Sequence, residues 1–149
     1  MLKEGDAAPD FKVLTDSGEE FDLAQHKNEK LVLYFYPRAD TPGCTIESCE
    51  FRDSVKKFTK KGVTVIGVSP DTPKAQAKFK EKFALNFTLL ADAEKEIANK
   101  YGVMKEKNMY GKKVMGVART TFFIENGTIV KIFTGVKPEG HAEEVLGSL

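Results

Sequence analysis

The chain is poor in cysteine and lacks long apolar stretches. Its 149 residues include two cysteines only, Cys44 and Cys49. No segment approaches the roughly 20 apolar residues of a membrane-spanning helix, and the N-terminus shows no apolar core of a signal peptide. We therefore expect a cytoplasmic protein that does not associate with a membrane. In that compartment, two cysteines are more typical of catalysis or redox chemistry than of a permanent disulfide.

An excess of charge of one sign is also lacking. The chain holds 23 basic and 22 acidic residues, for a net charge of +1, and this balance gives no electrostatic reason to expect nucleic acid or an anionic membrane as a partner. Hydrophobic residues make up 41% and charged residues 30%, as in ordinary globular proteins. There is no internal repeat, low-complexity stretch or linker, so we expect residues 1–149 to form a single domain.

The two cysteines lie where a strand pattern gives way to a helical one. Residues 31–36 form an apolar run, residues 37–43 contain two prolines and a glycine, and residues 44–60 show an amphipathic helical pattern. This order predicts a buried strand, a loop and a helix that starts at Cys44. A helix N-terminus offers free backbone N–H groups to an anion, and a thiolate is such an anion. The position therefore favours redox chemistry.

Thiol reactivity depends on the thiolate form. An ordinary cysteine thiol has a pKa of about 8.5, and helix N-termini and nearby cations lower that value. Gly43 lets the backbone approach closely, and Thr41 brings a hydroxyl that can donate to a sulfur anion or to a bound oxygen. The local sequence offers Arg38 as a candidate cation and no established one.

The spacing of the cysteines limits how they can react together. In a regular helix, residues five apart point about 140° away from each other, and their Cα atoms lie about 8.6 Å apart. A disulfide needs Cα atoms within about 7 Å of each other. A bond between Cys44 and Cys49 would therefore require the first helical turns to unwind. The helical projection also places Cys49 on the polar face, near Asp53 and Lys56, and Cys44 at the head of the apolar face.

Two other cysteine chemistries fit the sequence poorly. Thioredoxin-type disulfide exchange uses Cys-x-x-Cys, whereas four residues separate the cysteines here. A zinc site needs about four ligands, and the chain adds only His26 and His141, which lie far from the cysteines in the sequence. We therefore expect no metal site, and we expect both histidines to be solvated.

The remaining patterns alternate between strands and helices. The predicted order is two short strands within 11–21, a strand at 63–68, a helix at 71–83, a strand at 87–90, a helix at 93–100, a mostly irregular segment at 101–115, a β-hairpin at 120–133 that turns at Asn126 and Gly127, and a helix after Pro138. This order indicates an α/β protein with a thioredoxin-like fold. We expect a central mixed β-sheet flanked by helices, with an N-terminal β-hairpin extension.

Short motifs spread along the chain fit one known pattern. They lie at residues 35–37, 41–45, Glu47, Cys49, 51–53, 110–113 and 116–122. Together they resemble the motifs of the peroxiredoxins, and specifically of the bacterioferritin-comigratory-protein (Q-type) group. The resemblance covers essentially the whole chain, and a set of separated motifs is far more specific than two cysteines alone.

The resemblance implies a role for each matching residue of the site. Cys44 matches the peroxidatic cysteine and Cys49 the resolving cysteine. The implied pocket residues are Thr41, Pro37, Gly43 and Arg119, with Glu47 associated with that arginine. Arg119 would supply the cation that the local sequence lacks. Arg38 and Ala39 depart from the basic–acidic pair that is common in the group. Because that pair has no known catalytic role, the departure does not change the implied function.

The implied function is thiol-dependent reduction of hydrogen peroxide and organic hydroperoxides. Cys44 would become a sulfenic acid and then form an intramolecular disulfide with Cys49, which thioredoxin or a similar dithiol would reduce. No metal or organic cofactor is implied. We expect a monomer, and a weak dimer through the edge of the active site stays open.

Simpler interpretations of the same residues stay open. Cys44 could be a buried structural thiol, Cys49 a spectator, and Arg119 part of an ordinary surface ion pair. Thr41 could cap the helix or the loop, and Glu47 could be a favourable acid in the first turn of the helix. Two rival classes of protein also stay open, namely a disulfide reductase or isomerase and a redox-sensing or chaperone-like binding protein.

Overall fold

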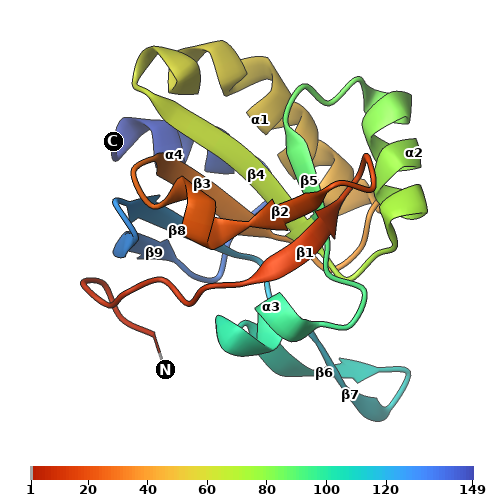
Figure 1. The fold of residues 1–149 in the computed structure, drawn as a ribbon. Helices are drawn as coiled ribbons and strands as arrows, with labels where there is room; N and C mark the ends of the chain where they lie inside the picture. The colour runs from red at the N-terminus through yellow and green to blue at the C-terminus, as the bar shows by residue number, and fades with distance from the viewer. Residues whose placement is uncertain (1) are drawn as a thin grey trace.

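The computed structural model describes residues 2–149, with residue 109 described by its backbone alone. A seven-stranded sheet with the order β2-β1-β5-β4-β3-β8-β9 forms its centre, and β6 and β7 pair as a separate hairpin (Figure 1). The strands are β1 (Lys12–Thr15), β2 (Glu20–Asp22), β3 (Lys30–Phe35), β4 (Val63–Ser69), β5 (Thr88–Ala91), β6 (Met104–Met109), β7 (Lys112–Val117), β8 (Thr120–Glu125) and β9 (Thr128–Phe133). The helices are η1 (Leu23–His26), α1 (Pro42–Lys60), α2 (Pro73–Phe83), α3 (Glu96–Lys100) and α4 (His141–Gly147).

The strand β3 lies in the middle of the sheet. It pairs in parallel with β4 and antiparallel with β8, which makes the sheet mixed, as predicted. Its side chains are buried on both faces, because successive strand residues point to opposite sides. Leu31, Leu33 and Phe35 join one core cluster, whereas Val32 and Tyr34 join the other. The continuous apolar run of this strand is thus explained by a sheet covered on both sides.

Each face of the sheet has its own cover. Apolar side chains of α1, α2 and α4 pack on the face that carries Tyr34, including Phe51, Phe58 and Phe79. The other face is covered by the N-terminal segment, η1 and α3, with Phe11 among the buried residues. The thioredoxin-like α/β architecture predicted from the sequence is therefore confirmed.

The two predicted hairpins of the main sheet are present. Asn126 and Gly127 have φ angles of 52° and 77° between β8 and β9, as a type I′ turn requires. The N-terminal hairpin of β1 and β2 joins the sheet through antiparallel pairing of β1 with β5. The predicted extension is therefore an integral edge of the sheet.

The prediction of a mostly irregular segment at 101–115 is wrong. Residues 104–117 form the antiparallel hairpin of β6 and β7, which projects from the main sheet below α3 (Figure 1). Its turn is made by Tyr110 and Gly111, with φ angles of 54° and 79°. Tyrosine is uncommon at a positive φ angle, and the strands are rich in lysine instead of alternating apolar residues, so the usual hairpin signals were missing.

Two helix starts differ from the predicted ones. α1 begins at Pro42, two residues before Cys44, because proline suits the first position of a helix. α2 begins at Pro73, and the Thr72 hydroxyl caps it by accepting a hydrogen bond from the Ala75 N–H. Within residues 2–149, no helix is both long enough and apolar enough to cross a membrane.

Candidate active site

The first turn of α1 places Cys44. Thr41 is the residue before the helix and has extended backbone angles, and Pro42 and Gly43 fill the first two helical positions. The Thr45 N–H donates to the Thr41 carbonyl over 2.8 Å, which closes the turn. Cys44 is fully buried beneath it. Its sulfur therefore lies at the positive end of the longest helix, shielded from bulk water.

A guanidinium reaches this sulfur from a distant part of the chain. Arg119 Nη2 donates to Cys44 Sγ at 3.1 Å, and Arg119 Nη1 donates to Glu47 Oε1 at 3.0 Å. Arg119 lies just before β8, whose first residue Thr120 pairs with Phe35 at the end of β3. Because β3 leads into the loop before α1, this pairing brings Arg119 to the helix start. The alternative of a surface ion pair is wrong, since Glu47 is buried.

Gly43 makes room for that contact. A Cβ atom at this position would lie 2.7 Å from Arg119 Nη2 and 3.3 Å from Pro138 Cγ. Both distances are shorter than an ordinary van der Waals contact. A side chain here would therefore displace the guanidinium from the sulfur, so glycine is needed because of space and not because of its backbone angles.

Glu47 is a buried carboxylate that lacks a full set of partners. Its Oε1 atom accepts from Arg119, while its Oε2 atom has no hydrogen-bond partner among the described residues. Burial raises the pKa of Glu47 to about 7, although the charge and hydrogen bond of Arg119 act in the opposite direction. Since α1 begins at Pro42, Glu47 lies beyond the first turn, and its interpretation as a first-turn acid is wrong.

The loop before α1 holds two further residues expected at the site. The Thr41 hydroxyl donates to the Arg38 carbonyl at 2.9 Å and makes no capping bond to α1. The hydroxyl of Thr41 therefore caps the loop and not the helix. Pro37 is half-buried two residues after the end of β3. Arg38 is exposed and contributes its carbonyl to this loop, whereas Arg119 provides the cation beside the sulfur.

Two buried tyrosines of the core make hydrogen bonds to helices, Tyr34 to α1 and Tyr36 to α2. The Tyr34 hydroxyl and Ser48 Oγ lie 2.8 Å apart, and the Tyr36 hydroxyl donates to Gln76 Oε1 at 2.7 Å. Gln76 in turn donates to the Leu90 carbonyl at 2.9 Å. Burial raises the pKa of Tyr36 far above its ordinary value. Both phenols therefore stay neutral and act as fixed hydrogen-bonding groups of the core.

The second cysteine lies on the same unbroken helix. Cys49 is half-buried and Cys44 is buried, and both are free thiols. Because α1 is continuous from Pro42 to Lys60, its regular geometry keeps the two sulfurs apart. The structure therefore shows the reduced arrangement, from which any bond between the cysteines requires unwinding.

Lys107 is a charged residue near the site that the sequence analysis missed. Its Nζ atom donates to the carbonyl of Val117, two residues before Arg119. Burial lowers the pKa of Lys107, as does the charge of Arg119, while the Cys44 sulfur acts in the opposite direction. Lys107 is one of several lysines in a segment expected to be irregular, so nothing in the sequence indicated that it lies near the site.

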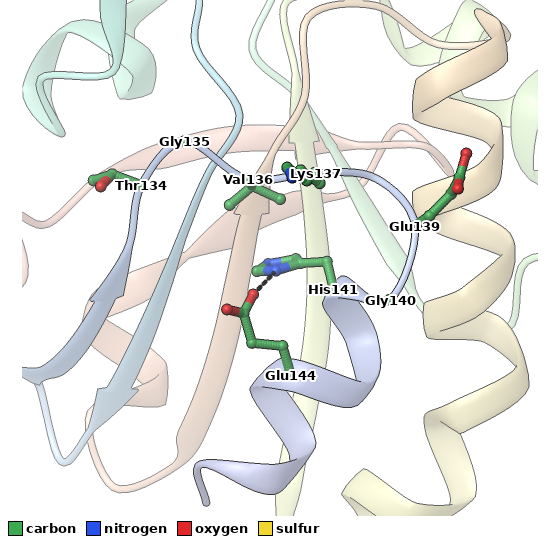
Figure 2. A pocket seen from close by; sticks show the side chains of 8 residues that line it. All are labelled: Thr134, Gly135, Val136, Lys137, Glu139, Gly140, His141 and Glu144. Carbon is green, nitrogen blue, oxygen red and sulfur yellow. Dashed lines mark hydrogen bonds and ion pairs between the residues drawn. The ribbon is translucent and has the colours of Figure 1, made fainter.

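The expectation that His141 is solvated is wrong. His141 is buried at the start of α4, where its Nε2 lies 2.7 Å from Thr121 Oγ1 and its Nδ1 lies 2.8 Å from Glu144 Oε1. His141 and Glu144 line a surface cavity of about 370 Å³, and Figure 2 shows these two side chains paired there. Neither cysteine is among the residues that line this cavity. Burial lowers the pKa of His141, whereas His26 is partly exposed beside Glu29.

Taken together, the geometry defines a class of protein. A buried thiol at a helix start meets a guanidinium delivered by a strand that is distant in the sequence, on a thioredoxin-like sheet. Such a pair favours the thiolate and offers positive charge to an oxygen bound beside it. The fold and the site are those of a thiol-based oxidoreductase.

Comparisons with known proteins identify the family. The model of the AhpC/TSA family matches residues 4–132. A bcp protein of Coxiella burnetii is 48% identical over 99% of each chain. The structure of Xylella fastidiosa PrxQ superposes with a TM-score of 0.94 at 35% identity, over 99% of this chain and 95% of that one. The bacterioferritin comigratory protein of Xanthomonas campestris gives a TM-score of 0.88 at 37% identity, over 93% and 88% of the two chains.

The chain therefore belongs to the AhpC/TSA family, within its Bcp/PrxQ group of peroxiredoxins. It is a thiol-dependent peroxidase, and the resemblance noted in the sequence is confirmed. The rival classes of disulfide reductase and redox-sensing binding protein are accordingly set aside.

Proposed function

We propose that Cys44 is the peroxidatic cysteine and that hydrogen peroxide and organic hydroperoxides are its substrates. The observation that carries this assignment is the 3.1 Å contact between Arg119 Nη2 and the buried Cys44 sulfur. The alkyl peroxide reduction activity of the related Xanthomonas campestris protein supports the organic substrates. Within the helix, Cys44 alone combines burial, a free thiol and a paired cation.

The reaction starts with the Cys44 thiolate attacking the terminal oxygen of the hydroperoxide. A sulfur electron pair forms the S–O bond while the O–O bond breaks, so the sulfur is oxidised and the peroxide reduced. The products are a sulfenic acid and an alkoxide, which takes a proton from water to leave as alcohol. Arg119 and the backbone N–H groups of the first turn of α1 stabilise the charge that develops on the oxygens.

The residues around the sulfur shape the peroxide pocket in this proposal. Gly43 allows Arg119 to approach, and Pro37 forms part of the wall beside the helix start. The Thr41 hydroxyl donates to the Arg38 carbonyl, so its oxygen can accept a hydrogen bond from the substrate. In this proposal, Arg119, Thr41 and Pro37 orient the peroxide for in-line attack.

Cys49 resolves the sulfenic acid. Its thiolate attacks the Cys44 sulfur, the hydroxyl leaves as water after taking a proton, and a disulfide forms between the two residues. The first turns of α1 must unwind for this step, because the regular helix holds the sulfurs apart. A thioredoxin-type dithiol then reduces the disulfide by exchange, so the electrons come from thiols alone and the cycle needs no metal or organic cofactor.

The assembly and setting of the enzyme are part of the same proposal. We assign it as a monomer, with a weak dimer through the edge of the active site as the alternative. The cytoplasmic location and the single domain over residues 1–149 stay predictions from the sequence.

Stopped-flow reaction of the reduced protein with hydrogen peroxide, followed by mass analysis, tests the assignment. We expect fast consumption of one equivalent of peroxide and the loss of two hydrogens from the protein mass. The Cys44→Ser variant should lose this reaction, whereas Cys49→Ser should keep one round of oxidation and stop at the sulfenic acid. A Cys44→Ser variant that turns over peroxide like the unmodified chain would overturn the proposal.

A further inference from the structure

The β6–β7 hairpin brings a second cation to the peroxide site. Lys107 lies on β6 opposite Val114, and its stem crosses to the base of the neighbouring strand. There its ammonium donates to the Val117 carbonyl at 2.5 Å. Val117 is buried and stands two residues before Arg119. Lys107 therefore binds the backbone of the segment that carries Arg119.

Close packing around the lysine stem shows that this contact is built into the hairpin. A Cβ atom at Gly116 would lie 3.1 Å from Lys107 Cδ and 3.4 Å from its Cε. The first distance is tighter than an ordinary contact and the second is at the lower limit of one, so a side chain at Gly116 would require the lysine stem to shift. By contrast, Lys105 on the same strand is exposed, which makes it a matched control.

The charges that face Lys107 belong to the reacting site. Burial and the positive charge of Arg119 lower the pKa of Lys107, and the Cys44 sulfur on α1 opposes them. The neighbouring acid Glu106 pairs instead with Lys113 on β7. The ammonium thus lies within electrostatic reach of the Cys44–Arg119 pair, and an anionic sulfur or oxygen there would be favoured by it.

We propose that Lys107 is a positioning residue for peroxide reduction, which fixes Arg119 through the Val117 carbonyl and adds a second positive charge to the segment that carries Arg119. The inference rests on the function proposed above. It assigns a catalytic purpose to the hairpin, whose two strands pair with each other and not with the main sheet. Lys107 acts through Val117 and Arg119 and does not contact the peroxide itself.

The test compares the rate of Cys44 oxidation by hydrogen peroxide in Lys107→Met, Lys107→Arg and Lys105→Met, from mildly acidic to alkaline pH. Lys107→Met keeps the apolar stem but loses the charge and the donor. We expect it to react on the order of tenfold to a hundredfold more slowly at neutral pH, because small displacements of a charged group cost that much. Lys107→Arg should restore most of the rate, and Lys105→Met should match the unmodified chain.

The pH profile separates this role from a purely structural one. The unmodified Lys107 loses its proton at a lower pH than an ordinary lysine, so the advantage of the unmodified chain over Lys107→Met should shrink as the pH rises. If Lys107→Met does not fold, Lys107→Gln takes its place with the same expectation.

Two results would overturn the inference. One is a Lys107→Met rate within about twofold of Lys105→Met. The other is a loss that is equal at every pH and is not rescued by arginine. The oxidation rate of the unmodified chain tests the proposed peroxidase function by itself. If that chain reacts fast and the Lys107 variants give either of these two results, only the inference about Lys107 is overturned.

Discussion

The two halves of α1 are held in the fold by different forces. Residues 42–50 are anchored by polar contacts, in which Cys44 and Glu47 meet Arg119 and Ser48 meets Tyr34. Residues 51–60 are anchored by apolar burial, with Phe51 and Phe58 fully buried. The half that carries the chemistry includes a carboxylate oxygen without a partner, whereas the other half is close-packed.

The border between the halves is marked by Arg52. Arg52 Nη1 donates to the Phe83 carbonyl at 2.7 Å, and the Arg52 carbonyl accepts from Asn86 Nδ2 at 3.3 Å. These bonds tie the helix to the end of α2 and the segment after it. Unwinding that brings Cys44 to Cys49 can therefore stop at this point, because the residues beyond it stay anchored. The comparison teaches that one helix combines a reactive part, which a disulfide between its cysteines would require to unwind, with a part that can stay anchored.

The largest expected effect lies in the apolar half. Phe58→Ala should lower the free energy of unfolding by about 3–5 kcal/mol, because it leaves a cavity in a fully buried position. Denaturant unfolding measures this cost, with Val55→Ala, a half-buried position on the same helix, as a milder control. The rate of Cys44 oxidation in the folded variant should be unchanged. A large loss of that rate would break the distinction between the halves.

The next effect is catalytic and lies in the polar half. Arg119→Met should slow the oxidation of Cys44 by about a hundredfold to a thousandfold, as expected for the loss of a donor that stabilises developing charge. Stopped-flow kinetics with hydrogen peroxide measure the change. Arg38→Met is the control, since Arg38 is exposed and should be dispensable. Equal rates in the two variants would contradict the assignment of Arg119.

The raised pKa of Glu47, in the same half of α1, predicts that the free energy of unfolding depends on pH. Its pKa of about 7 in the folded protein exceeds its ordinary 4.5, so the folded state binds the proton more tightly. The stabilisation is fully present below about pH 4.5 and is lost as the pH rises through about 7. Glu47→Gln keeps an acceptor for Arg119 without titrating. The unmodified chain should therefore lose about 1–3 kcal/mol relative to this variant over that range.

Denaturant titrations of the two proteins across the same pH range measure that difference. Curves of unfolding free energy that run parallel from pH 4.5 to pH 7 would show that Glu47 titrates like an ordinary carboxylate. The polar half would then carry no strain from the buried charge.

The smallest expected effect concerns a single hydrogen bond. Tyr34→Phe removes the hydroxyl that meets Ser48 Oγ at 2.8 Å, and should cost about 1 kcal/mol of stability. Because the bond exists only while the first turns of α1 are helical, disulfide formation after oxidation should become several-fold faster. Quenched-flow mass analysis measures that step. Slower disulfide formation would mean that the bond does not restrain unwinding.

Local signals in the sequence were sufficient for much of the fold. The Asn126–Gly127 turn follows from the backbone preferences of its two residues and was predicted correctly, and the helix predicted at 71–83 is present although α2 begins at Pro73. The apolar run of β3 and the apolar face of α1 are likewise local patterns. The structure of these two segments depends little on the rest of the chain, because the order of apolar and polar residues indicates whether one face or both faces are buried.

Features that depend on tertiary packing could not be predicted in this way. The β6–β7 strands carry several lysines and no regular apolar alternation, and they turn at Tyr110, so neither alternation nor turn chemistry marks them. His141 is buried only because Phe51 and Phe133 pack against its ring. The contact between Arg119 and Cys44 spans 75 residues of sequence, and it was expected through the family resemblance alone.

The pairing of β3 has a consequence for the newly made chain. β3 needs β8 as its antiparallel neighbour, and Arg119 directly precedes β8. A ribosome delivers the N-terminal residues first, so Cys44 emerges long before its guanidinium partner exists. A chain still under synthesis therefore has both cysteines but no assembled peroxide site. The same strand pairing that completes the sheet brings Arg119 to Cys44, so the site proposed for peroxide reduction is assembled only once β8 has paired with β3.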